Sequence, residues 1–246
     1  IIVRYAKEEA EKLKDLPADE TGRIVDEQVN KFIEQVQLIC EGSNFAAREY
    51  TLKLDDAVNE QRNIIYQLRE KVLVSENLLD LIEPMVKDSI RAKIAQHTGD
   101  DRLPEEWDIK RLVHDCKQLI ATPEVKVSGF YEEREPLERE IFRALEAYMD
   151  VLENEVLKSA VVERLKPFLL SLIDRKWSMQ LDAMTRLREG IGLRSYGQED
   201  PMRVYQREAL ELFSKMHREL QWETSVQMAA IVRSYLAHKE QKVQST

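Results

Sequence analysis

Residues 25–72 read VDEQVNKFIEQVQLICEGSNFAAREYTLKLDDAVNEQRNIIYQLREKV, and this stretch decides the fold. It contains no proline and a single glycine, Gly42, so little in it opposes a helix. Apolar or small side chains recur mostly at steps of three or four residues, which places them along one helical face. They are Val29, Phe32, Val36, Ile39, Ser43, Ala46, Tyr50, Leu54, Ala57, Ile64, Leu68 and Val72. The stretch therefore predicts one unbroken helix of ~70 Å at 1.5 Å per residue, with other helices packed along its apolar face.

The composition also favours an all-α protein. Of the 246 residues, 43% are hydrophobic and 34% are charged, and the 7 Gly and 7 Pro are too few for an all-β fold. The formal net charge of -9 argues against nucleic acid as the main partner, because phosphate binding needs a basic surface. No apolar run reaches the roughly 18 residues of a membrane span. The two cysteines, Cys40 and Cys116, match no disulfide framework and favour a reducing compartment.

The first 24 residues differ from the helix that follows them. The β-branched opening IIVRY reads as a strand whose neighbours are missing, and residues 6–23 predict a short helix and a loop. We therefore interpret residues 1–24 as the end of a preceding domain, and we expect the chain to be part of a longer protein.

After the long helix, residues 25–75, the sequence predicts a small helical subdomain over residues 76–155. Pro84, Pro104 and a turn-rich stretch ending at Gly129 divide it, and Pro167 is expected to interrupt the helical pattern that follows. The expected helices cover residues 85–96, 106–120 and 131–164.

Residues 156–240 end in two helices joined by the loop GIGLRSYGQEDP, which predicts an αα-hairpin. Asp200 followed by Pro201 favours the start of the second helix, because aspartate caps and proline fits the first position. The stretch 175–207 carries 7 basic and 4 acidic residues, which suits either a nearby anionic surface or a solvated face. The tail after Tyr235, and residues 241–246 above all, is expected to fray. The first helix should bury Leu170, Ile173, Trp177, Leu181, Met184, Leu187 and Ile191.

The chain lacks the sequence motifs of a catalytic or metal site. It contains no GxxxxGK[ST] loop, no HExxH, no CxxC and no GxSxG. His114 and Cys116 could offer two ligands, but two residues apart on a helix they face different directions. We therefore expect no catalytic residue, no metal and no cofactor in this chain.

Two groups of residues are candidates for function. A polar group lies on the long helix, where it either acts as a switch or only bonds to neighbouring helices. Its members are Asp55, Asp56, Asn59, Gln61 and Arg62. The second group lies in the hairpin loop, where Tyr196 either offers an aromatic contact surface or folds back on the loop. That group consists of Leu193, Arg194, Tyr196 and Gln198.

Two long motifs resemble the SecA family of bacterial protein-translocation motors. The first is NFAAREYTLKLDDAVNEQRNIIYQLREKVL from Asn44 to Leu73, which is similar to the family's scaffold helix. The second is LDAMTRLREGIGLRSYGQEDPMRVYQREALELF from Leu181 to Phe213, which is similar to its two-helix finger. A weaker match, EEWDIKRL, lies where the family has its helical wing. The motifs occur in the family's order and cover most of residues 25–240.

The resemblance implies an all-α, elongated part of a larger motor, in which a very long scaffold helix packs against the finger and a small wing is inserted. SecA-like proteins hydrolyse ATP with Mg²⁺ in upstream motor domains and push preproteins through the SecYEG channel. The family likeness implies that the polar group of the scaffold helix couples the motor to the finger, and that Tyr196 touches the moving polypeptide. It also implies a cytoplasmic protein that lies peripherally at the inner face of the plasma membrane.

The sequence departs from the family pattern at a few positions. Where the family has Glu and His after Trp177, this chain has Met179 and Gln180, and Ser43 stands where Arg is usual. The family's cysteine-rich zinc tail has no counterpart here. These differences suggest an accessory SecA paralogue or a trimmed chain. The alternative function is a non-catalytic helical adaptor that joins partner proteins.

Overall fold

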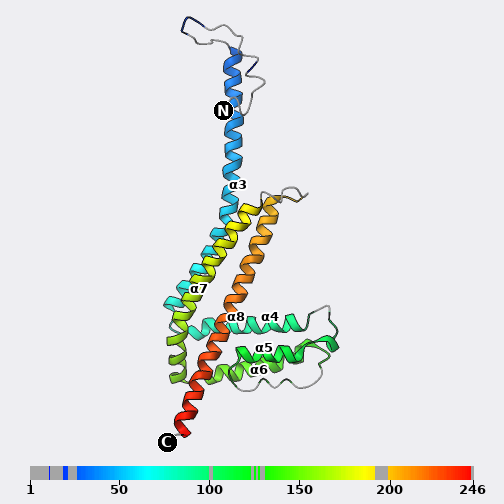
Figure 1. Cartoon of the computed structure of the whole chain (residues 1–246), viewed down its shortest axis with the longest axis vertical. Coiled ribbons are helices and arrows are strands. Elements are labelled where there is room, and N and C mark those ends of the chain that lie inside the picture. Colours follow the sequence, from blue (N-terminus) through cyan, green and yellow to red (C-terminus); the bar gives the residue numbers. More distant parts are fainter. Residues whose placement is uncertain are drawn as a thin grey trace. The chain divides into compact units, whose positions relative to one another are not determined.

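The computed structural model describes residues 11, 19–21, 27–99, 102–122, 125, 127, 131–191 and 199–244 (Figure 1). Across these residues the regular structure consists of α-helices and one 3-10 turn, without a strand, so the predicted all-α class is confirmed. The expected strand at residues 1–5 and most of the expected helix and loop at 6–23 lie outside the described residues. The chain divides into two compact units, residues 1–59 and 60–246, and each is described by itself.

Helix α3 runs from Glu27 to Val74 and confirms the prediction of one unbroken helix. In the first unit, Val36 is the one buried side chain among the described residues 27–53. Ile39 and Tyr50, which the sequence placed on a buried stripe, are exposed, and Phe45 is 63% exposed. Helical periodicity therefore predicted the backbone of this segment correctly but not the burial of its side chains.

In the second unit, α3 from Glu60 to Val74 buries a face made of Gln61, Ile65 and Val72. These positions are four and seven residues apart, which keeps them on one side of the helix. The prediction that Ile64 belongs to this face is wrong, since its side chain is 49% exposed. Because a glutamine occupies one of these core positions, a search for apolar residues did not identify which residues form the buried face.

Helix α4 spans Leu78–His97 and contains Pro84 in its interior. The expectation that the helix begins after Pro84 is therefore wrong. Proline removes one main-chain hydrogen bond from a helix. The turn before it buries Leu78, Leu79 and Ile82, and this burial of apolar surface offsets the lost bond.

Two further helices complete a small core with α4. The 3-10 turn Pro104–Glu106 precedes α5, Ile109–Leu119, which starts where Asp108 Oδ1 accepts the Arg111 main-chain N–H at 2.9 Å. Helix α6 spans Arg134–Leu152. The shared core contains Val86, Ile90, Ile94, Leu112, Leu119, Leu137, Ile141, Leu145 and Tyr148.

Helix α7 spans Glu155–Ile191, so the break that the sequence placed at Pro167 lies instead at residues 153–154. Asn154 starts α7, because its Oδ1 accepts the Leu157 main-chain N–H at 3.1 Å. Pro167 lies inside the helix between the fully buried side chains of Leu165 and Leu169. Tertiary burial again outweighs the loss of one backbone bond.

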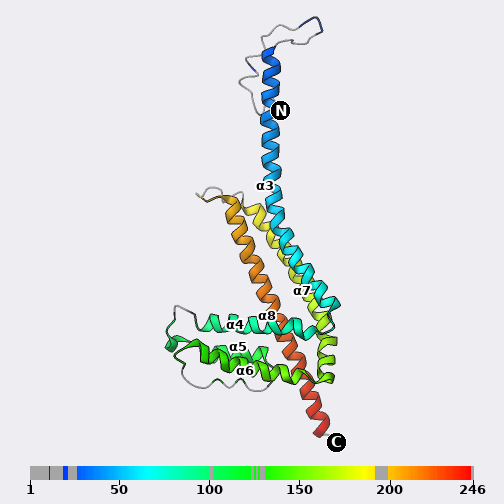
Figure 2. The same ribbon diagram turned by 180° about the vertical axis from the view of Figure 1, so that it is seen from behind.

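Helix α8 spans Pro201–Gln244 and begins at the predicted Asp200–Pro201 pair, where Asp200 Oδ1 accepts the Met202 N–H at 3.0 Å. Figures 1 and 2 show α7 and α8 side by side, as predicted for the hairpin. Helices α4 and α5 pack on α8, whereas α6 packs on α4 and α7. The helix continues through the stretch after Tyr235, for which the sequence favoured a frayed tail. Near its end, Arg233 donates from Nη2 to the carbonyl oxygens of Lys117 at 2.6 Å and Gln118 at 3.1 Å, at the carboxyl end of α5.

Candidate functional site: polar contacts on helix α8

The structure describes only part of the candidate residues. The loop group of Leu193, Arg194, Tyr196 and Gln198 lies outside the described residues. In the first unit, Asp55 is half-buried, while Asp56 and Asn59 are exposed. In the second unit, Gln61 is buried and Arg62 is exposed.

Gln61 links α3 to both helices of the hairpin. Its Nε2 donates to the Ala209 carbonyl oxygen on α8 at 3.2 Å, and its Oε1 accepts from Gln180 Nε2 on α7 at 3.0 Å. The exposed fraction is 7% for Gln61 and 3% for Gln180. We call Gln61, Gln180 and the Ala209 carbonyl the amide junction.

The direction of the hydrogen bonds in the amide junction follows from the Ala209 carbonyl. A backbone carbonyl can only accept, so Gln61 must turn its NH2 group toward Ala209. The Gln61 oxygen then faces Gln180, which must donate to it. One backbone group therefore fixes the orientation of two side-chain amides.

A second contact joins α7 and α8 through charge. Lys176 Nζ lies 2.7 Å from Glu219 Oε2 and 2.7 Å from Glu223 Oε1, two carboxylates one helical turn apart. Arg175 pairs with Glu223 at 2.9 Å, so two cations meet two anions. Burial acts to lower the pKa of Lys176, but its bonds to both carboxylates outweigh burial and raise it above 10.5. We call this group the Lys176 clamp, and it fixes the position of α7 along α8.

A third contact lies where α4 and α5 meet α8. Asp115 Oδ2 lies 3.1 Å from both Lys93 Nζ and His97 Nε2, and Lys93 Nζ also lies 4.5 Å from the centre of the Trp222 ring. Because the Asp115 carboxylate only accepts, the His97 Nε2 must carry the hydrogen. Burial acts to raise the pKa of Asp115, but the bonds from His97 and Lys93 outweigh it and hold that pKa below 3.8. We call these four residues the Asp115 cluster.

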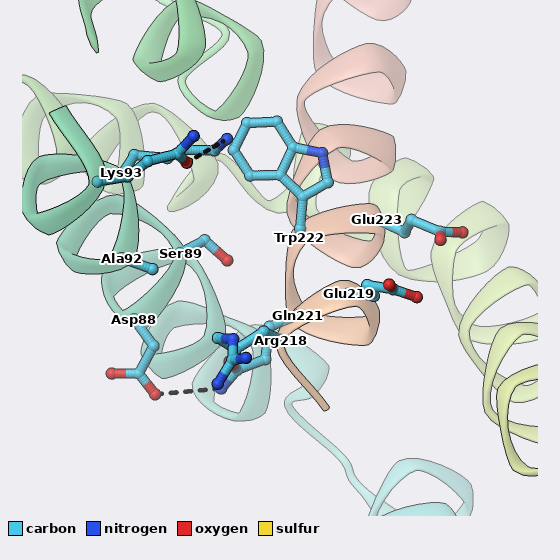
Figure 3. Close-up of a pocket in the computed structure, with 10 residues that line it drawn as sticks. Asp88, Ser89, Ala92, Lys93, Arg218, Glu219, Gln221, Trp222 and Glu223 are labelled. Carbon is cyan, nitrogen blue, oxygen red and sulfur yellow. Dashed lines mark hydrogen bonds between the residues drawn. The ribbon is translucent and has the colours of Figure 1, made fainter. Parts of the chain in front are cut away.

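A pocket of about 420 Å³ lies beside the Asp115 cluster, between α4 and α8. Figure 3 shows the Trp222 indole pointing toward Lys93, and a dashed line marks the 3.1 Å bond from Gln221 Nε2 to Asp88 Oδ2. Glu219 and Glu223 also line the pocket, and their carboxylates lie on the side of α8 away from Lys93, which agrees with their bonds to Lys176 (Figure 3). The lining side chains carry both charge signs and one indole, which suits contact between helices.

The described residues form no cluster of three or more His, Cys, Asp and Glu side chains that could hold a metal. His114 is exposed with its Nε2 3.3 Å from Gln118 Nε2, whereas Cys116 is fully buried, so the two face different directions as their spacing predicted. Burial raises the pKa of the Cys116 thiol to about 12, which keeps it protonated and unreactive. None of the described helices is long and apolar enough to cross a membrane.

Sequence reasoning missed Gln180, Lys176 and Asp115 as structural contacts. A signal for Gln180 was present, because it lies three residues after Trp177 and four before Met184, on the buried face of α7. The prediction had placed Leu181 on that face, but its side chain is only half-buried. Lys176 and Asp115 gave no such signal, since charged residues usually face solvent.

Comparison with known proteins identifies the family. The family model described as "SecA Wing and Scaffold domain" matches residues 23–232. The chain is 39% identical over 232 residues to "Protein translocase subunit SecA 2" of Geobacillus thermodenitrificans, covering 94% of this chain and 29% of that protein. It is 38% identical over 239 residues to the SecA 2 subunit of Bacillus thuringiensis, covering 94% and 30%.

The chain is also similar to a SecA 1 subunit. The chain is 35% identical over 214 residues to "Protein translocase subunit SecA 1" of Alkaliphilus metalliredigens, covering 86% of this chain and 24% of that protein. The chain therefore spans less than a third of the length of these relatives. On this evidence the chain belongs to the SecA family, and its residues 23–232 form a wing and scaffold domain.

Proposed function

We propose that this chain is the scaffold, wing and finger part of an ATP-driven protein translocase. In the parent protein it couples the motions of upstream ATPase domains to the movement of preproteins through the SecYEG channel. The observation that carries this proposal is the match of residues 23–232 to the SecA wing and scaffold domain. The names of the relatives, translocase subunits, support the same function.

The contacts of the hairpin support a mechanical role. The Lys176 clamp fixes α7 along α8, and the amide junction ties both helices to α3. A hairpin held at two separate levels moves as one stiff body, which is what transmission of force requires. The exposed apolar side chains of α3, such as Leu38, Phe45 and Leu52, offer a surface to the parent's own motor domains.

Within this function we assign parts of the chain as follows. Residues 1–24 are the end of the upstream motor domain, 25–75 the scaffold helix and 76–155 the wing. Residues 156–240 are the scaffold return and the two-helix finger, followed by the tail 241–246. ATP and Mg²⁺ are cofactors of the parent protein and bind outside this chain, and the parent acts peripherally at the cytoplasmic face of the membrane.

The higher identity to the SecA 2 subunits supports an accessory paralogue. Identity is 39% and 38% to two SecA 2 subunits and 35% to a SecA 1 subunit. We propose that the parent exports a narrower set of preproteins than a housekeeping SecA, with the same mechanism.

The finger tip provides the test of this function. We assign contact with the moving polypeptide to Leu193, Arg194, Tyr196 and Gln198, with Tyr196 offering its aromatic face. In the parent protein, Tyr196→Ala should impair preprotein transport into SecYEG vesicles more than it impairs ATP hydrolysis without preprotein. Tyr196→Phe keeps the aromatic face and should retain most transport. Equal loss of both activities in the alanine variant, or no loss of transport, contradicts the role of the tip.

The ATPase assignment has its own test. The parent should hydrolyse ATP and carry a GxxxxGK[ST] loop upstream of this chain, whereas the isolated chain should show no turnover. A parent without such a loop, or turnover that purifies with the isolated chain, overturns the proposal.

A further inference from the structure

The amide junction places two glutamines where a helical core would ordinarily hold apolar side chains. Gln61 shares its buried face with Ile65 and Val72, and Gln180 shares its face with Trp177 and Met184. Each amide alone would be an unsatisfied polar group in the core, which is unfavourable. The two amides are acceptable because Gln180 donates to the Gln61 oxygen, and Gln61 in turn donates to the Ala209 backbone carbonyl.

We propose that Gln180 is a positioning residue, which presets the Gln61 amide so that α3 engages α8 and passes displacement of the scaffold helix to the finger. The proposal rests on the translocase function proposed above. In the junction, Gln180 donates its hydrogen bond to Gln61 and acts by occupying the Gln61 oxygen. The Gln61 NH2 group is thereby left to bond to Ala209.

The geometry leaves a narrow range of positions in which both bonds of the amide junction form. Hydrogen bonds at 3.0 and 3.2 Å weaken steeply when the heavy atoms move apart by much more than half an ångström. A small shift of α3 along α8 therefore breaks the bond to Ala209 rather than stretching it.

The junction can open without unfolding α8. Inside an α-helix, the Ala209 carbonyl also accepts the main-chain N–H of Phe213, four residues later. When Gln61 leaves, the carbonyl keeps this partner, so the helix loses no internal bond. The position of the bond, on a carbonyl that is already satisfied, suits a contact that forms and breaks during work.

The first experiment measures the coupling of the two amides in the chain itself. Gln61→Met, Gln180→Met and the double variant are compared with the unchanged chain by urea unfolding, followed by circular dichroism. Each single variant leaves one buried amide group without its partner and should lower the folding equilibrium constant about 5- to 10-fold. The double variant removes both amides and should return to within about twofold of the unchanged chain.

The second experiment separates positioning from stability in the parent protein. The double variant should fold normally yet transport about two- to fivefold less preprotein per ATP hydrolysed. The reason is that α3 then lacks the hydrogen bond from Gln61 that joins it to α8. Gln118→Met is the matched control, since this half-buried glutamine on α5 lies outside the junction, and its transport per ATP should not change.

The outcomes distinguish this inference from the proposed function. Additive effects in the two single variants, or an unchanged amount of preprotein per ATP in the well-folded double variant, overturn the positioning role. A parent that transports no preprotein in its unchanged form overturns the proposed function instead, and the urea experiment still decides whether Gln180 positions Gln61.

Discussion

The amide junction and the Asp115 cluster both fasten other helices to α8, but they use opposite chemistry. The junction is neutral, and its two glutamines satisfy each other and a backbone carbonyl. The Asp115 cluster holds α4 and α5 with one carboxylate, one ammonium, one imidazole and one indole. We therefore expect the amide junction to respond to displacement of α3 and hardly to pH, whereas the Asp115 cluster depends on charge and therefore on pH.

The largest effect is expected from Asp115→Asn. The change removes the charge that Lys93 and His97 share, and leaves an ammonium group in a largely buried place with a weaker acceptor. We expect the free energy of unfolding to fall by about 2 kcal/mol. Urea unfolding measures it, with the exposed Asp182→Asn as the control. If both variants lose equally little free energy of unfolding, charge does not hold the Asp115 cluster together.

Acid should remove the same contribution in the unchanged chain. The folded pKa of Asp115 lies below 3.8, so the folded state holds its proton less tightly than the unfolded state does. The stabilisation is therefore fully present above pH 3.8 and is lost as the pH falls further. The difference in free energy of unfolding between the unchanged chain and Asp115→Asn should shrink from pH 7 to pH 3. A constant difference would speak against this ionisation.

A smaller effect is expected from Lys176→Met in the clamp between α7 and α8. The methionine fills the buried space of the lysine stem, while Glu219 and Glu223 are partly exposed and can turn to water. We expect a loss of about 1 kcal/mol in urea unfolding. Lys215→Met, at an exposed lysine of α8, is the control, and an equal loss there would show that the clamp contributes nothing.

The smallest effect is expected from Arg69→Gln. Arg69 Nε bonds to Asp174 Oδ1 at 2.9 Å and thus joins α3 to α7, as the amide junction does. Unlike the amides, the side chains of this ion pair are both exposed to solvent. Exposed ion pairs contribute little, so the midpoint of thermal unfolding should stay within error of the unchanged chain. A clear fall of that midpoint would mean that the surface pair, rather than the buried amides, fastens α3.

The helical class, the unbroken α3 and the α7–α8 hairpin could be predicted because spacings of three and four residues determine a helical face. The behaviour of Pro84 and Pro167 could not be predicted, since a local rule places a break at proline. Both prolines lie inside helices whose neighbouring turns bury apolar side chains, and sequence alone does not reveal that burial.

Only part of the candidate site could be predicted for a related reason. Gln61 was a candidate because of its place on the scaffold helix, but its partners lie 119 and 148 residues away in sequence. Gln180 lay on a recognisable apolar face of α7. In the sequence it was interpreted as a departure from the SecA family motif and not as a hydrogen-bond partner of Gln61. Tyr196 and its neighbours remain predictions, since they lie outside the described residues.

The bond from Arg233 to the end of α5 has a consequence for the order in which the chain folds during synthesis. Helix α5 has 11 residues, a length at which an isolated helix is marginal in water. Two of its last carbonyl oxygens receive their hydrogen bonds from a side chain 115 and 116 residues further along. Helix α5 therefore gains these two hydrogen bonds only after Arg233 has left the ribosome, although α5 itself is made much earlier.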